Sequence, residues 1–305
     1  MPTLEQLRKM SPIRRLAYWA TEREKVRSLK EQASEKPWTT DPILQSYRFC
    51  NVRRMDDKVS RWLMENWYGP FFDHPNMLAA VALARFVNKP ESLLLLTEHL
   101  FTGKKGTPPW WDTIKALLRT VKKNGGTVFN GAYMVLGNST KSPDKIGMVV
   151  DEYVRPMFDV SFTGGVWEIN RESMCKTHAK LQKHYGFGSF MAGQVVADLR
   201  WAVKGEWKDR MTWAPMGPGS ARGLARLVNP EDWKTTAKRH VTQPHVWLKR
   251  FQEHVLDVLP SLLPRELSSK LEAHDYQNCL CEFDKYERVV WGEGKPKQKY
   301  PGREE

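Results

Sequence analysis

Apolar side chains recur at steps of three and four residues along most of the sequence, and no other feature constrains the fold as strongly. In the stretch 47–67 the apolar stripe consists of Val52, Met55, Val59, Trp62 and Leu63. Residues at this spacing lie on one face of an α-helix. Similar patterns, separated by Pro and Gly, follow at 76–87, 90–100, 113–123, 173–183, 190–203, 221–227, 244–258 and 268–289. The sequence therefore predicts a mainly α fold.

Strand signals are few. The best are the segments 127–135 and 160–167, which are short and equally compatible with helix or loop. We expect residues 1–36, rich in Arg, Lys and Glu, to form an N-terminal basic helical arm that is exposed to solvent. Residues 37–291 are expected to form a helical domain of one or two lobes, and the polar residues 292–305 a flexible tail.

The charge of the chain favours a polyanionic partner. Lys and Arg number 48 against 35 Asp and Glu, a formal net charge of +13, which points to nucleic acid first. The longest apolar stretch, 77–87, contains Arg85 and is too short to cross a bilayer. The N-terminus lacks an apolar signal region. We therefore expect a cytoplasmic protein with no membrane partner.

The four cysteines do not suggest a disulfide framework. Cys50 and Cys175 are isolated, and Cys279 and Cys281 are separated by one residue. Together with His274, the last two lack the paired spacing of a tetrahedral zinc site. Helix packing is the simpler explanation for both, and we expect no metal site.

A glycine-rich segment, 216–224, leads into a predicted helix. Glycine permits a tight turn and close approach, a serine can cap the helix, and the helix N-terminus favours a phosphate. In a basic protein this resembles the hairpin of the helix-hairpin-helix fold, which holds a DNA backbone without reading sequence. The predicted DNA-binding residues are Gly217, Gly219, Ser220 and Arg222. An ordinary turn between two helices is the alternative.

Two further segments combine polar groups with helical spacing. In 186–201, Gln194 and Asp198 are four residues apart and share a helix face that suits hydrogen bonds to a base edge. The alternative is a close-packed helix in which Asp198 pairs with a nearby Arg. In 47–63, arginines including Arg48 and Arg53 alternate with aromatics, a pattern that suits phosphate contact and base stacking. Core packing is the simpler account of these aromatics.

The segment 275–288 carries the densest set of chemical groups. Asp275, Asn278, Glu282 and Lys285 follow one another at steps of three and four, so a helix brings carboxylate and ammonium groups together on one face. General acid or base catalysis can use such an arrangement. A solvated helix face is the alternative.

Taken together, the segments 47–63, 129–134, 186–199, 217–224 and 278–288, with the trailing 292–296, resemble a helical family of phage DNA hypermodification systems. This family comprises the helical domain of the 5-hydroxymethyluracil DNA kinases and the related α-glutamyl/putrescinyl thymine pyrophosphorylases, or amino-acid:DNA transferases. The segments run in order through most of the chain, although none is as specific as a metal signature. The resemblance implies that residues 37–291 are similar to helix-hairpin-helix DNA glycosylases, which grip double-stranded DNA and flip one base.

The resemblance also implies a reaction. A 5-hydroxymethyluracil in DNA, phosphorylated or pyrophosphorylated beforehand, loses that leaving group to an amino acid or a polyamine. The chain has no P-loop pattern of Gly, four residues and Gly-Lys-Ser/Thr, so a separate P-loop DNA kinase is the expected partner. No cofactor is expected beyond the activated base and the amine donor.

The reaction needs groups that neutralise the departing phosphate, deprotonate the amine and read the base. The catalytic candidates are Glu282, Asp284, Lys285 and Asp198. The substrate-binding candidates are Arg48, Asn51 and Gln194. In this scheme Lys285, Arg48 or Arg222 would bind the phosphate. One of the carboxylates would orient and deprotonate the amine, and Asn51 or Gln194 would read the uracil edge.

Two other functions stay open: a DNA glycosylase acting on a modified base, and a non-catalytic DNA-binding partner of a 5-hydroxymethyluracil DNA kinase. Glycosylases of the helix-hairpin-helix type are expected to carry a hairpin lysine and a later aspartate. Here Ala221 and Arg222 follow Ser220, Asp232 arrives early and Asp275 arrives late. The glycosylase is therefore the weaker enzymatic alternative.

Overall fold

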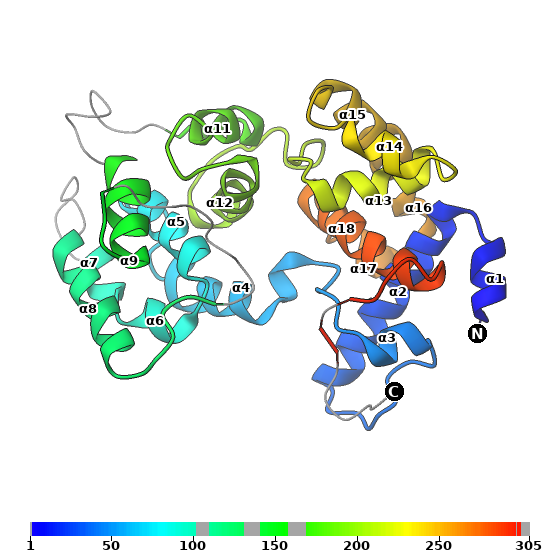
Figure 1. Cartoon of the computed structure of the whole chain (residues 1–305), viewed down its shortest axis with the longest axis horizontal. Helices are drawn as coiled ribbons and strands as arrows, with labels where there is room; N and C mark the ends of the chain where they lie inside the picture. Colours follow the sequence, from blue (N-terminus) through cyan, green and yellow to red (C-terminus); the bar gives the residue numbers. More distant parts are fainter. Residues whose placement is uncertain (1, 102–109, 131–140, 158–168, 297, 300–305) are drawn as a thin grey trace. The chain divides into compact units, whose positions relative to one another are not determined.

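The computed structural model describes residues 2–101, 110–130, 141–157, 169–296 and 298–299 (Figure 1). Helices dominate these residues and no β-strand occurs among them, which confirms the mainly α prediction. The segment 160–167, considered as a strand, lies outside the described residues, as do residues 131–135. The chain forms two compact units: unit 1 consists of Met1–Asp57 and Arg210–Glu305, and unit 2 of Lys58–Asp209.

Unit 1 is built around its last helix. Its helices are α1 (Leu4–Lys9), α2 (Pro12–Glu31), α3 (Pro42–Ser46), η1 (Arg54–Asp56), α13 (Pro218–Val228), α14 (Trp233–Lys238), α15 (Pro244–Phe251), η5 (Gln252–Leu256), α16 (Leu259–Leu262), α17 (Arg265–Ser268) and α18 (Ala273–Val290). Helix α18 packs against α13, α2, α1, η1 and η5, and Figure 1 shows it alongside α13 and α2. Phe283 and Tyr286 of α18 are fully buried in this core.

Helix α2 belongs to the core of unit 1. Its Leu16 and Trp19 are completely buried, and its Arg15 is buried in an ion pair with Glu287 of α18. The expectation of an exposed N-terminal arm therefore does not hold for this helix. The sequence did not indicate this burial, because the apolar residues of α2 are few and are scattered among charged ones. The partner of Arg15, Glu287, is 272 residues away in the sequence.

Close approach of α13 to α18 explains two glycines of the segment 216–224. A Cβ atom at Gly219 would lie 2.4 Å from Cys281 Sγ, and one at Gly223 would lie 2.1 Å from the carbonyl oxygen of Leu280. Both distances are far shorter than a van der Waals contact. Glycine at these positions lets the two helix backbones pack directly, which orients the charged side chains that both helices carry.

Unit 2 surrounds a wholly buried helix. Its helices are α4 (Lys58–Leu63), η2 (Met64–Tyr68), α5 (Met77–Val87), α6 (Pro90–Leu94), α7 (Thr97–Phe101), α8 (Trp111–Lys123), α9 (Lys145–Gly147), η3 (Met148–Val154), η4 (Arg155–Met157), α11 (Met174–Leu181) and α12 (Ser189–Ala202). Every residue of α5 is buried, and α5 packs against α12 and η3. No helix of the described residues is long and apolar enough to cross a membrane.

We expect unit 2 to lose stability as the pH falls below the ordinary histidine pKa of about 6.5. Burial lowers the pKa of three histidines of this unit, His74, His178 and His184, and outweighs the opposing hydrogen bonds of the first two. The unfolded chain then binds more protons than the folded one, so stability is complete above that pH and declines as the pH falls through it.

Urea unfolding between pH 8 and pH 5 measures this decline. His178 is the most buried of the three, and its Nε2 lies 3.0 Å from the carbonyl oxygen of Ser189. The variant His178→Gln should show a shallower decline with pH than the unsubstituted protein. An identical decline in both proteins would contradict a contribution from His178.

Candidate functional site

One face of α18 holds the chain segment 50–54. Asp275 Oδ1 accepts a hydrogen bond from the backbone N–H of Arg54 at 2.8 Å. One turn along, Asn278 Nδ2 donates to the carbonyl oxygen of Asn51 at 3.4 Å. After a further turn, Glu282 Oε2 accepts from the N–H of Cys50 at 3.1 Å. The shared face that the spacing predicted is therefore present, but its side chains hydrogen-bond to the backbone of residues 50–54 instead of facing solvent.

Glu282 and Lys285 form an ion pair at the end of this face. Lys285 Nζ lies 2.5 Å from Glu282 Oε1, with 3% of the Glu282 side chain and 32% of the Lys285 side chain exposed. Burial acts to lower the pKa of Lys285, but the attraction and hydrogen bond of Glu282, together with Cys50 and Cys281, outweigh it and the pKa is raised. Lys285 is thus a protonated cation that solvent and ligands can reach, suited to bind an anion and unsuited to act as a base.

Asp284, on a neighbouring face, forms ion pairs with three guanidinium groups. Its oxygens lie 2.8 Å from Arg222 Nε, 3.1 Å from Arg226 Nε and 3.7 Å from Arg288 Nε. Only 1% of the Asp284 side chain is exposed, whereas Arg222 is 42% exposed. Asp284 is therefore placed to hold arginines, and Arg222 is the most exposed of the three.

The charges of Lys285 and Arg222 both act on the thiol of Cys281. Burial raises the pKa of Cys281 to about 11, with Glu282 adding to the rise, while Lys285 and Arg222 act in the opposite direction. This sulfur packs against Gly219 of α13, and α13 and α18 carry the two cations, Arg222 and Lys285. We call Glu282, Lys285, Asp284 and Arg222 the α18 charge cluster.

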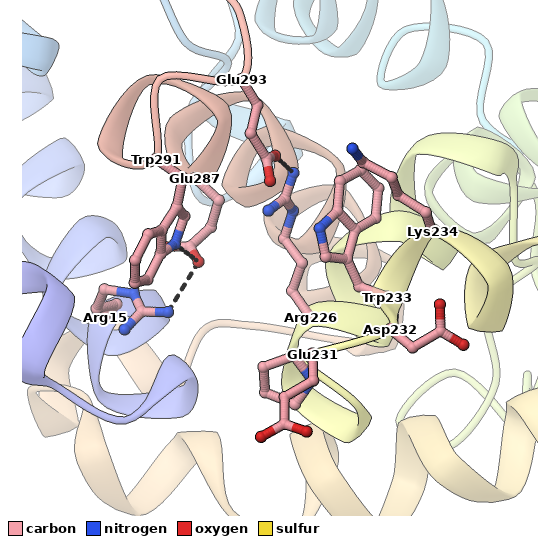
Figure 2. Close-up of a pocket in the computed structure, with 10 residues that line it drawn as sticks. Arg15, Arg226, Glu231, Asp232, Trp233, Lys234, Glu287, Trp291 and Glu293 are labelled. Carbon is pink, nitrogen blue, oxygen red and sulfur yellow. Dashed lines mark hydrogen bonds and ion pairs between the residues drawn. The ribbon is translucent and has the colours of Figure 1, made fainter.

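A cavity of about 520 Å³ lies beside the cluster, within unit 1. Arg226 belongs to both, because it bonds Asp284 and also lines the cavity. Figure 2 shows Trp291, Glu287 and Arg15 on one side, Trp233 with Arg226 on the other, and Glu293 reaching toward Arg226. We call this space the tryptophan cavity.

Ion pairs fix the walls of the tryptophan cavity. Arg15 Nε and Nη2 bond the two carboxylate oxygens of Glu287 at 2.7 and 2.9 Å, and Trp291 Nε1 donates to Glu287 at 3.1 Å. On the other side the Arg226 guanidinium stacks on the ring of Trp233, 3.8 Å from its centroid. These contacts orient the two indole rings.

The predicted substrate-binding residues of unit 1, Arg48 and Asn51, lie beside or within the segment 50–54. Asn51 uses its amide internally: Nδ2 donates to the carbonyl oxygen of Asp56 at 2.8 Å, and Oδ1 accepts from Arg23 at 2.5 Å. Arg48 is exposed, and its backbone N–H donates to the carbonyl oxygen of Gln298 at 3.0 Å. Arg48 is thus an exposed residue beside the segment 50–54, while Asn51 is engaged in holding its own loop.

The predicted DNA-binding segment begins α13. Ser220 Oγ accepts hydrogen bonds from the N–H of Gly217 at 3.0 Å and from Gln277 at 2.8 Å, and the serine is 1% exposed. The preceding helix in the chain, α12, ends at Ala202, and residues 203–217 between the two are irregular. Gly219 and Gly223 thus have a packing explanation, whereas no atom lies within 4 Å of a Cβ at Gly217, and Arg222 is the exposed cation of the segment.

The last two predicted residues lie in unit 2. Asp198 is completely buried, bonds Arg85 Nε at 2.7 Å and Nη2 at 2.5 Å, and accepts from the hydroxyl of Tyr68 at 2.6 Å. Pairing with an arginine is what the packing alternative expected. Gln194 is half-buried on the same helix, α12.

Sequence reasoning missed the tryptophan cavity. Arg226 follows Arg222 by one helical turn, and Glu287 lies in the segment 275–288, so both were within reach of the helical spacing. Arg15 and Trp233 carried no such signal, because their partners are remote in sequence or belong to another helix.

The fold and the site define a basic, helical protein whose described helices gather arginine, lysine and carboxylate groups around α18. The model of the family described as "5-hmdU DNA kinase, helical domain" matches residues 11–296. The chain belongs to this family.

A curated relative points the same way. A 5-hmdU DNA kinase of Bacillus phage SP10 is 24% identical over 216 residues, which cover 63% of this chain and 32% of the phage protein. The chain thus matches about a third of that relative's length. No solved structure matches the chain.

Proposed function

We propose that the protein takes part in the hypermodification of thymine bases in DNA, by transferring an amine onto a phosphorylated or pyrophosphorylated 5-hydroxymethyluracil. Membership of the 5-hmdU DNA kinase helical-domain family supports 5-hydroxymethyluracil as the modified base, and the net charge of +13 supports a DNA substrate. The observation that carries the chemistry is the α18 charge cluster, in which each of two accessible cations pairs with its own buried carboxylate, Lys285 with Glu282 and Arg222 with Asp284.

In this proposal Lys285 and Arg222 bind the phosphate of the activated base. The amine nitrogen attacks the exocyclic methylene carbon, and the bond between that carbon and the phosphate oxygen breaks. The phosphate leaves with the bonding electron pair, and its added negative charge is stabilised by the two cations. The attacking nitrogen gives up one proton, which needs a nearby base.

Glu282 is the proposed base. In the structure its Oε1 is bound by Lys285 and its Oε2 by the N–H of Cys50. A phosphate that draws Lys285 away would release Oε1 to accept the proton. The backbone contact would keep the carboxylate in place during this exchange.

The direct test is mass spectrometry of nucleosides from 5-hydroxymethyluracil DNA. The DNA is incubated with this protein, a 5-hydroxymethyluracil DNA kinase, ATP and a mixture of amino acids and polyamines. We expect an aminated thymidine that requires both proteins. Abasic sites would instead support a glycosylase, and DNA binding with no new nucleoside would support a non-catalytic subunit.

The variants Lys285→Gln and Glu282→Gln are expected to lower product formation by about 100-fold, the scale on which a charged transition-state contact or a general base contributes. Lys270→Gln and Glu266→Gln are matched controls, because both side chains are exposed in the same unit and outside the cluster. Thermal unfolding of each variant separates loss of catalysis from loss of fold. Full activity in both cluster variants would remove Glu282 and Lys285 from the mechanism.

A further inference from the structure

The tryptophan cavity has the size of a small-molecule site. Its volume of about 520 Å³ falls within the range of about 300–1,000 Å³ that ligand pockets occupy. Three of its lining side chains are already paired and buried: Arg15 is 3%, Glu287 1% and Arg226 3% exposed. These three are held in place before a ligand arrives, which lowers the cost of reorganisation, while the other lining residues are exposed or half-buried.

The charge of the lining is opposite to that of the chain. The carboxylates among the lining residues are Glu231, Asp232, Glu287 and Glu293, against the cations Arg15, Arg226 and Lys234. The chain as a whole carries +13. An excess of carboxylate inside such a basic protein disfavours a phosphate and favours a cation.

The internal pairs leave specific carboxylates for a ligand. Glu287 is satisfied by Arg15, and Glu293 Oε2 accepts from Arg226 Nη2 at 2.5 Å. Glu231 and Asp232 are exposed beside Trp233, and no ion pair between described residues involves either one. Asp232 makes no side-chain bond to the helix it precedes, α14, so its carboxylate is not needed as a cap.

The indole rings already attract cations. The guanidinium carbon of Arg226 lies 3.8 Å from the ring centroid of Trp233, and that of Arg15 lies 5.4 Å from the centroid of Trp291. Aromatic faces combined with carboxylates are the chemistry by which proteins recognise ammonium groups.

We propose that the tryptophan cavity binds a small organic cation bearing a primary ammonium group, with Trp233 and Trp291 as its walls and Glu231 and Asp232 as its counter-charges. The binding follows from the cavity alone. The further role of this cation as the amine donor rests on the proposed function, and the cavity adjoins the α18 charge cluster through Arg226, which bonds Asp284.

Isothermal titration calorimetry of the full chain, without DNA or kinase, tests the proposal. The titrants are putrescine, spermidine, lysine and, as an anionic control, succinate. We expect the amines to bind and succinate not to bind. The double variant Glu231→Gln/Asp232→Asn should weaken amine binding about tenfold, equal to ~1.4 kcal/mol.

The matched control is Glu253→Gln/Asp257→Asn, which removes the same charge from exposed positions of unit 1 outside the cavity. It should bind the amines as the unsubstituted protein does. Binding of putrescine without lysine identifies a polyamine site, and binding of lysine identifies an amino-acid site; either outcome supports the proposal. Absence of amine binding, or equal affinity in both double variants, would overturn it.

The calorimetric result stands apart from the nucleoside assay. Amine binding with no aminated nucleoside would leave the cavity assigned and reject the transferase. An aminated nucleoside formed equally well by Glu231→Gln/Asp232→Asn would support the transferase and reject the cavity as the site of the amine donor.

Discussion

Asp198→Asn is expected to lower the free energy of unfolding by about 3–5 kcal/mol, the usual effect of removing one partner of a buried ion pair. Asp198 is completely buried, and Arg85 is only 3% exposed. The amide would leave the Arg85 guanidinium without its counter-charge inside unit 2. Urea unfolding followed by circular dichroism measures the loss.

Glu206→Gln is the control for this variant. Glu206 also pairs with a cation, Lys208, at 3.0 Å, but both side chains are about two-thirds exposed. An exposed pair of this kind adds little to stability, so the control should unfold like the unsubstituted protein. An Asp198→Asn protein of full stability that had lost product formation would instead assign Asp198 to catalysis.

Gly223→Ala is expected to destabilise unit 1 by about 3 kcal/mol, because overpacking of a tight interface has costs of this size. The added Cβ would lie 2.1 Å from the carbonyl oxygen of Leu280, a backbone atom that cannot rotate away. Helices α13 and α18 would have to separate. Chemical unfolding reports the loss of stability.

Alkylation of Cys281 reports the separation itself. Burial against α13 raises the pKa of this thiol to about 11, so its reaction with iodoacetamide at neutral pH should be slow. In Gly223→Ala the reaction should accelerate. Gly217→Ala is the control, since no atom lies within 4 Å of a Cβ at that position; a variant Gly223→Ala as stable as this control would contradict direct backbone packing.

The helical architecture was predictable because it depends on local spacing. The patterns at 221–227 and 268–289 correspond to α13 (Pro218–Val228) and α18 (Ala273–Val290). The same spacing placed Asp275, Asn278 and Glu282 on one face of α18, where the structure has them. Period alone was sufficient for these features.

The contacts that this face of α18 makes could not be predicted from the helical spacing. Glu282 meets the N–H of Cys50, 232 residues away, and Arg15 meets Glu287 across 272 residues. Such pairs leave no trace in local patterns, since either partner looks like any charge on a helix surface. For the same reason α2 was interpreted as an exposed arm, and the tryptophan cavity was missed.

The order in which the ribosome makes the chain gives the division into units a further consequence. Unit 1 is interrupted by unit 2, so its central helix, α18, is synthesised only after all of unit 2. Helix α2 therefore emerges long before α13, α16 and α18, the unit 1 helices that follow unit 2 and pack against it. Because domains generally fold as units during synthesis, unit 2 is free to fold first, and α2 lacks these packing partners until the second part of unit 1 has been made.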